Sequence, residues 1–286
     1  MCDTLQIAPS TYYDFKAKKN NPERRSEREQ SDELYRVEIK RVWEDNFQVY
    51  GARKVWHQLK REGFTIARCT VERLMRCMGL QGAVRGKVKR TTIPSKENHE
   101  PADLVHRNFQ ATKPNQLWVA DFTYVATWIG FVFVAFIIDA FSRMIVGWQV
   151  ARTMSADLTL DALEQAIWAR DINGQIIHHS DHGSQYLSIR YTDRLAEAGI
   201  KASVGSVGSA YDNALAETIN GLFKTEVIRK RCPWKTMESV EYATLEWVHW
   251  FNNTRLFEPI GNIPPAELEK MYYTNLKSLP VAAGLK

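Results

Sequence analysis

The chain has 286 residues, 44% of them hydrophobic and 25% charged, a composition typical of globular proteins that allows one large core and a smaller one. Its longest apolar run, Phe131 to Ile138, is far shorter than the roughly 20 residues that span a bilayer. The amino terminus also lacks the basic start and apolar stretch of a signal peptide. These features predict a cytoplasmic protein with no membrane partner.

The net charge of +5 is unevenly distributed along the chain. Residues 1–100 hold 21 Lys and Arg against 14 Asp and Glu, whereas the remainder holds 17 against 19. A basic first third indicates an anionic partner, most often nucleic acid. Because such asymmetry also occurs in proteins that bind no nucleic acid, charge alone does not decide the function.

Residues 1–30 are polar and are expected to form a segment without a strong core. Residues 31–80 predict three helices, because apolar side chains recur at helical spacing and two of the helices stop at Gly63 and Gly79. Two short helices joined by a tight turn suit a helix-turn-helix domain that binds DNA. A plain three-helix bundle with solvated arginines is the alternative.

Basic side chains in the first third are candidate DNA contacts, because they can reach phosphates or guanine edges. Three lie on the third helix, and four lie in the run RGKVKR within a linker predicted at 81–112. A solvated tether is the alternative for the linker. The candidates are Arg68, Arg73, Arg76, Arg85, Lys87, Lys89 and Arg90.

Residues 113–275 are predicted to form an α/β core, followed by a tail at 276–286. The run 131–139 is almost wholly apolar, which predicts a strand that is buried on both faces of a sheet. The order β-β-β-α-β-α-β followed by helices predicts a ribonuclease-H-like fold with a five-stranded mixed sheet. The predicted strands are 117–126, 131–139, 144–151, 175–180 and 200–204, and the predicted helices are 155–170, 188–198, 212–230 and 236–253.

Three acids occur where such elements would converge. Asp121 lies in the first strand, Asp181 closes the fourth strand, and Glu217 lies on the following long helix. Phosphodiester chemistry needs an activated oxygen nucleophile and a stabilised leaving oxygen, which two magnesium ions held by a few carboxylates can supply. An isolated Asp or Glu is usually a solvated surface group. The prediction therefore depends on all three acids together and on the order of the strands and helix that carry them.

The helix that carries Glu217 presents a polar stripe. Asn213, Glu217, Asn220 and Lys224 are spaced by four, three and four residues, which places them on one face. A carboxylate, two amides and a lysine in line suit a metal site beside a DNA backbone. Asn213, Asn220 and Lys224 are therefore further candidate DNA contacts.

Two other groups near the predicted strand ends are alternative site residues. His178, His179 and His182 cluster as metal-binding histidines can, but they alternate around a strand end. Asp139 closes the second strand, and a structural role is the favoured interpretation for it.

The segments LWVADFTYV, FIIDAFSRMIVGW, HSDHGSQY, SAYDNALAETINGLFKTE and WFNNTRLFEPIGNIPPAE closely resemble bacterial insertion-sequence transposases of the retroviral-integrase-like DDE group. In this group two overlapping reading frames make the transposase, and the chain resembles the downstream-frame product over essentially its whole length. Asp181 and Glu217 are separated by 35 residues, the spacing of the group's catalytic signature.

The resemblance implies that Asp121, Asp181 and Glu217 bind two Mg²⁺ ions, for which Mn²⁺ is expected to substitute, and that Lys224 contacts the transposon end. It implies double-stranded DNA partners, namely the terminal repeats and the target, and a homo-oligomer. It also implies fusion by frameshift to an upstream-frame product, with which the abrupt start of the chain agrees. Asp139 is not one of the group's three metal-binding acids.

The resulting hypothesis is a transposase that cleaves DNA at the element ends to free a 3′ hydroxyl, which then attacks another phosphodiester. One alternative is a ribonuclease-H-like nuclease that cuts RNA in a hybrid. The other is a helix-turn-helix regulator with an inactive core.

Overall fold

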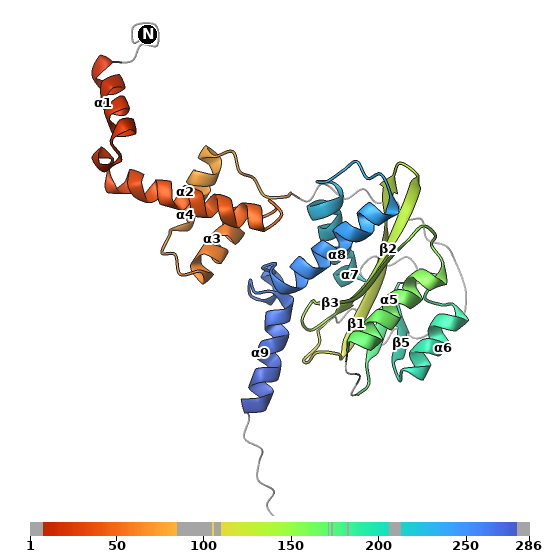
Figure 1. Cartoon of the computed structure of the whole chain (residues 1–286). Coiled ribbons are helices and arrows are strands. Elements are labelled where there is room, and N and C mark those ends of the chain that lie inside the picture. Colours follow the sequence, from red (N-terminus) through yellow and green to blue (C-terminus); the bar gives the residue numbers. More distant parts are fainter. Residues whose placement is uncertain are drawn as a thin grey trace, which may run out of the picture. The chain divides into compact units, whose positions relative to one another are not determined.

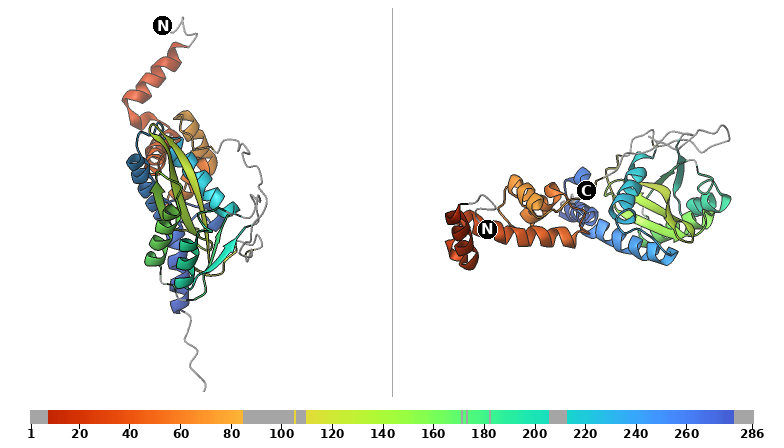
Figure 2. Two further views of the ribbon diagram at one scale, coloured as in Figure 1. Left: turned by 90° about the vertical axis from the view of Figure 1, so that its right-hand side faces the viewer. Right: turned by 90° about the horizontal axis from the view of Figure 1, so that it is seen from above.

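The computed structural model describes residues 8–84, 105, 110–170, 172, 174–181, 183–205 and 213–278. The chain divides into two compact units, Met1–Ala83 and Val84–Lys286 (Figures 1 and 2). In the described part of the chain, no helix combines the length and the apolar character needed to cross a bilayer.

The first unit contains the three helices that the apolar spacing predicts. They are α2 (Glu27–Asp45), α3 (Ala52–Arg61) and α4 (Arg68–Cys77). The glycines that follow α3 and α4 adopt the positive φ angles of helix ends, 91° at Gly63 and 68° at Gly79. The shared core contains Ile39, Val42, Val55, Leu59, Val71 and Leu74, all buried.

The start of α2 and an additional helix before it were not predicted. A reciprocal capping box between Ser26 and Glu29 begins α2 four residues ahead of the predicted start. Before it lie α1 (Pro9–Asn20) and the 3₁₀ turn η1 (Pro22–Arg24). None of the residues of α1 is buried, in agreement with the expected lack of a strong core in this segment.

The second unit is built on a five-stranded sheet with the order β3-β2-β1-β4-β5. The antiparallel pairs β1–β2 and β2–β3 and the parallel pairs β1–β4 and β4–β5 make it the predicted mixed sheet. The strands are β1 (Leu117–Thr127), β2 (Gly130–Asp139), β3 (Ile145–Ala151), β4 (Ile177–Ser180) and β5 (Lys201–Val204).

Helices cover both faces of this sheet (Figure 1). On one face, α5 (Ala156–Ala169) and α6 (Ile189–Glu197) pack on a core that includes Trp118, Ala135 and Leu163. On the other, Phe136 of β2 contacts Phe223 of α7 (Ala214–Phe223) at 5.2 Å and Trp247 of α8 (Met237–Asn253) at 5.9 Å between ring centroids. The order of strands and helices confirms the predicted α/β class.

The helix predicted at 212–230 changes its winding within the described residues. After α7 the chain continues as the π-helical segment η2 (Lys224–Ile228). Within η2, the carboxylate of Glu226 is buried and accepts hydrogen bonds from Arg255 and from the Trp247 indole. This buried ion pair ties η2 to the chain that follows α8.

The carboxyl-terminal helices are tied to the β2–β3 connection by buried polar groups. Asp139 is fully buried and accepts hydrogen bonds from the backbone nitrogens of Asn115, Phe141 and Ser142. The Ser142 hydroxyl donates to Glu269 on α9 (Pro265–Ser278), the helix that follows the short 3₁₀ turn η3 (Glu258–Ile260). These contacts confirm the structural role expected for Asp139.

Candidate active site

Asp121 and Asp181 occupy equivalent positions relative to two neighbouring parallel strands, Asp121 within β1 and Asp181 directly after β4. The β1–β4 pairing runs from Leu117 with Ile177 to Ala120 with Ser180. Asp121 is the next residue of β1 and Asp181 directly follows β4, and paired parallel strands lie only about 4.8 Å apart. The local register therefore brings these two predicted acids together at one edge of the sheet.

Two asparagines attach the Glu217 helix to this edge. Asn213 precedes α7, and its Nδ2 donates to the carbonyl oxygen of Ala120 at 2.9 Å. Asn220, two turns further along, donates from Nδ2 to Oδ2 of Asp121, also at 2.9 Å. Glu217 lies between them on the same helical face, and its side chain is exposed. The helix is thus anchored on both sides of the third acid.

The electrostatics of the site favour a bound cation. The pKa of Asp121 is raised to about 8, first by burial and then by the negative charges of Asp181 and Glu217. Hydrogen bonds from the Phe122 backbone and from Asn220 act in the opposite direction but only partly offset these effects. A divalent cation would relieve the repulsion among the three carboxylates.

The loop after Asp181 contributes two residues to which the sequence analysis gave no role. Gly183 donates its backbone N–H to Oδ1 of Asp181 at 3.2 Å, and a Cβ at Gly183 would lie 3.1 Å from that same oxygen. Tyr186 is buried, and its hydroxyl has no hydrogen-bond partner among the described residues. Burial above all raises the pKa of Tyr186, and the charges of Asp121 and Asp181 add to this effect.

The three predicted acids form an open site rather than a closed metal cage. Across the residues that the structure describes, no three Asp, Glu, His or Cys side chains are already gathered around a common metal position. Magnesium commonly keeps several waters and binds through one or two carboxylates together with substrate phosphates. The adjacent Asp121 and Asp181, with Glu217 exposed beside them, fit that mode of binding.

The histidine alternative is not supported by the positions of His178 and His179. Both are buried, and their ring nitrogens lie 2.9 Å from the Tyr191 hydroxyl and the Ser203 hydroxyl, respectively. Burial lowers the pKa of His178 to about 3, which keeps its ring neutral within the core. His182 lies outside the described residues.

The predicted DNA contacts on the Glu217 helix differ in their surroundings. Asn213 and Asn220 are buried against β1, which suits positioning of the strand end better than contact with a DNA backbone. Lys224 is half-buried, and its Nζ lies over the Tyr124 ring, 4.7 Å from the centroid. Burial lowers the pKa of Lys224, whereas the charge of Asp121 acts to raise it.

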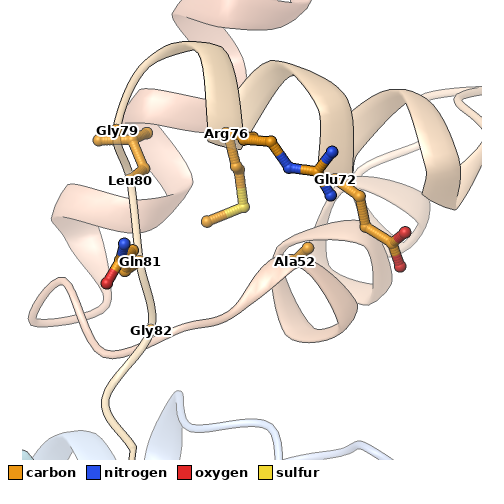
Figure 3. A pocket seen from close by; sticks show the side chains of 8 residues that line it. Ala52, Glu72, Arg76, Gly79, Leu80, Gln81 and Gly82 are labelled. Carbon is orange, nitrogen blue, oxygen red and sulfur yellow. The ribbon is translucent and has the colours of Figure 1, made fainter.

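The arginines predicted to contact DNA from α4 also differ. Arg73 donates to both carboxylate oxygens of Asp32, at 2.7 and 2.9 Å, so its guanidinium holds α4 against α2. Arg68 forms an exposed ion pair with Glu72. Arg76 is exposed and borders a pocket of about 340 Å³, where Figure 3 shows it beside Glu72. Arg85, Lys87, Lys89 and Arg90 lie outside the described residues.

Matches to protein families fall separately on the amino-terminal helices and on the carboxyl-terminal α/β unit. Residues 111–210 and 198–265 match the family described as "Integrase core domain". Residues 29–88 match the "HTH-like domain" family. The matched families and the five-stranded mixed sheet define a ribonuclease-H-like integrase catalytic core preceded by a helical, HTH-like domain.

Curated relatives cover almost the full length of the chain. It is 56% identical to the "Transposase for insertion sequence element IS629" of Shigella sonnei, over 99% of this chain and 95% of that protein. It is also 56% identical to the "Putative transposase for insertion sequence element IS986/IS6110" of Mycobacterium tuberculosis, over 94% and 97%. The HTLV-2 integrase catalytic core domain, solved in complex with magnesium, covers 56% of this chain and 99% of its own at 18% identity and a TM-score of 0.45.

The chain therefore belongs to the insertion-sequence transposases, which confirms the family assignment made from its motifs. Its enzymatic class is DDE-type polynucleotidyl transfer in DNA transposition, rather than hybrid-specific RNA cleavage or regulation by an inactive core. The integrase core family depends on divalent metal ions, binds DNA and forms oligomers.

Proposed function

We propose that Asp121, Asp181 and Glu217 are the catalytic acids with which this transposase cleaves DNA at the ends of its element and joins them to target DNA. The observation that carries the proposal is the register of β1 and β4, which ends on Ala120 and Ser180 and so sets the two aspartates side by side. The asparagines that flank Glu217 on α7 attach the third acid to the same edge.

We further propose that these acids hold two Mg²⁺ ions, for which Mn²⁺ substitutes. Three carboxylates form the hard oxygen donor set that magnesium prefers, and burial together with the charges of Asp181 and Glu217 raises the pKa of Asp121. When bound, the two ions would activate the attacking oxygen and stabilise the leaving oxygen.

The protein groups around the acids then act by positioning. Asn220 fixes the orientation of the Asp121 carboxylate, and the Gly183 N–H fixes that of Asp181. Lys224 and the exposed Arg76 are proposed to contact DNA phosphates, as are Arg68 and the four basic residues of the RGKVKR run. Arg73 and Asn213 are proposed to act structurally, because their donors are already used within the fold.

We expect Asn220→Ala to lower the rate of magnesium-dependent cleavage by about 10- to 100-fold, as loss of a group that orients a metal ligand typically does. The substitution removes the donor that holds Oδ2 of Asp121. Initial cleavage rates measured across a magnesium titration should show a higher concentration for half-maximal activity, an effect that loss of packing alone would not produce. Asn253→Ala is the matched control, because Asn253 is exposed on α8. An unchanged magnesium requirement in Asn220→Ala would contradict the positioning role.

The proposed function is tested on labelled duplexes that carry the element's own ends, with magnesium or with EDTA. The chain is used both alone and fused to its upstream-frame product, a partner that we propose from the resemblance to two-frame transposases. Joined products that require magnesium support the proposal. Faster cleavage of RNA–DNA hybrids than of duplex ends, or end binding without any cleavage, would contradict it.

A further inference from the structure

The tip of the β1–β2 hairpin exposes a patch of large apolar side chains. The exposed fractions are 56% for Tyr124, 67% for Trp128, 61% for Ile129 and 58% for Phe131. We call these four residues the hairpin surface. A cluster of exposed apolar side chains, unlike a single one, commonly marks an interaction site.

The hairpin surface is built on a well-defined backbone. The Thr127 hydroxyl donates to the Gly130 carbonyl at 2.7 Å across the turn, and the Trp128 N–H donates to the Trp234 carbonyl at 3.0 Å. The Tyr124 and Phe131 rings meet edge to face at 5.5 Å. The exposed rings are therefore held in place before any partner arrives.

Positive charge is interleaved with these rings. Lys224 lies over Tyr124 at 4.7 Å, and Lys235 lies over Trp128 at 5.2 Å from the ring centroid. Between these two lysines in the sequence, Arg229 and Lys230 add two basic residues, whereas Arg231 is ion-paired with Glu246. The acid in this stretch, Glu226, is buried and paired with Arg255. The charge of the surface therefore suits an anionic partner.

The hairpin surface begins beside the proposed catalytic acids. Tyr124 follows Asp121 by three residues on β1, and the charge of Asp121 acts on Lys224. From Asp121 to Thr127 the strand extends about 20 Å, at roughly 3.3 Å per residue. Because successive side chains alternate between the two faces of a strand, Tyr124 and Asp121 project from opposite faces of β1. Lys224, which lies over the Tyr124 ring and interacts with the charge of Asp121, links the hairpin surface to the acids.

We propose that the hairpin surface binds unpaired nucleotides of the DNA end, with bases stacked on Trp128 and Tyr124 and phosphates contacting Lys224 and Lys235. Aromatic rings interleaved with cations bind single strands, because every unpaired base offers a flat face while bases within a duplex are already stacked on each other. This inference rests on the proposed function only in taking DNA as the ligand.

The test compares binding of the full chain to a blunt duplex and to the same duplex with a short single-stranded tail, in EDTA so that no cleavage occurs. The tail carries a fluorescent base analogue that reports stacking. We expect wild type to prefer the tailed duplex by about 5- to 100-fold. Trp128→Ala should lose most of this preference and the stacking signal, whereas Trp128→Phe should keep much of both. The matched control is Trp168→Ala, because Trp168 is 90% exposed on α5.

The outcomes separate this inference from its alternatives. An unchanged tail preference in a folded Trp128→Ala protein overturns it. If Trp128→Ala instead dissociates an oligomer without changing the tail preference, the hairpin surface is a contact between copies of this chain and the inference is wrong. The same binding assay on Glu217→Gln separates the two proposals, because tail binding is expected to persist there whether or not strand transfer is lost.

Discussion

Asp121→Asn is expected to make the metal-free protein more stable at pH 8, by about 2 to 5 kcal/mol or roughly 4–20 °C in the melting temperature. Burial and the charges of Asp181 and Glu217 raise the pKa of Asp121 to about 8, far above its value of about 3.9 in an unfolded chain. At pH values between these two pKa values, the Asp121 carboxyl keeps a proton in the folded state that it has lost in the unfolded state. The free energy of unfolding of wild type therefore falls as pH rises from about 4 to 8.

Thermal unfolding in EDTA across this pH range checks the prediction. The difference between Asp121→Asn and wild type should be largest near pH 8 and should shrink towards pH 4, below which the carboxyl becomes protonated in both states. Magnesium should then stabilise wild type more than the variant, because a ligand stabilises only the state that binds it. Asp157→Asn, an exposed acid on α5, serves as the control. A variant that is less stable than wild type at every pH would refute this account of the site's electrostatics.

Asp181→Asn is expected to lower the rate of end cleavage on the order of a thousandfold while the protein still binds the DNA ends. A bound metal supplies several kcal/mol of charge stabilisation, and each 1.4 kcal/mol corresponds to about a factor of ten in rate. Single-turnover cleavage of a labelled end duplex gives the ratio of the wild-type rate to the Asp181→Asn rate, and DNA binding is measured in parallel. Glu238→Gln, an exposed acid on α8, should retain the wild-type rate. Near-normal cleavage by Asp181→Asn would remove Asp181 from the proposed site.

Much of the fold could be predicted because its elements carry local signals. The β2 strand is an almost continuous apolar run, and α3 and α4 repeat one apolar stripe before a glycine. The change to a π-helix at Lys224 could not be predicted, because apolar spacing does not distinguish a wider turn from an ordinary one. The helix α1 was missed because it buries no residues and so leaves no amphipathic pattern.

The three acids could be predicted from the order of the elements that carry them and from the spacing of the resembling family. The partners of the side chains around them could not, because those partners lie far away in sequence. A shared helical face placed Asn213 and Asn220 together, but only the folded chain shows that both donate to β1, at Ala120 and Asp121. Similarly, Arg73 pairs with Asp32 across 41 positions. The hairpin surface likewise depends on which apolar side chains of β1 and β2 stay exposed, a property that strand patterns alone do not contain.

The central claim is that one site made of Asp121, Asp181 and Glu217 carries out magnesium-dependent strand transfer. Its most direct test is the formation of joined DNA products by wild type and by Glu217→Gln, each fused to the upstream-frame product and each shown to bind the element ends. We predict joined products from wild type with magnesium and none above background from Glu217→Gln. Joining by Glu217→Gln at the wild-type level, or end binding by wild type without any joining, would contradict it.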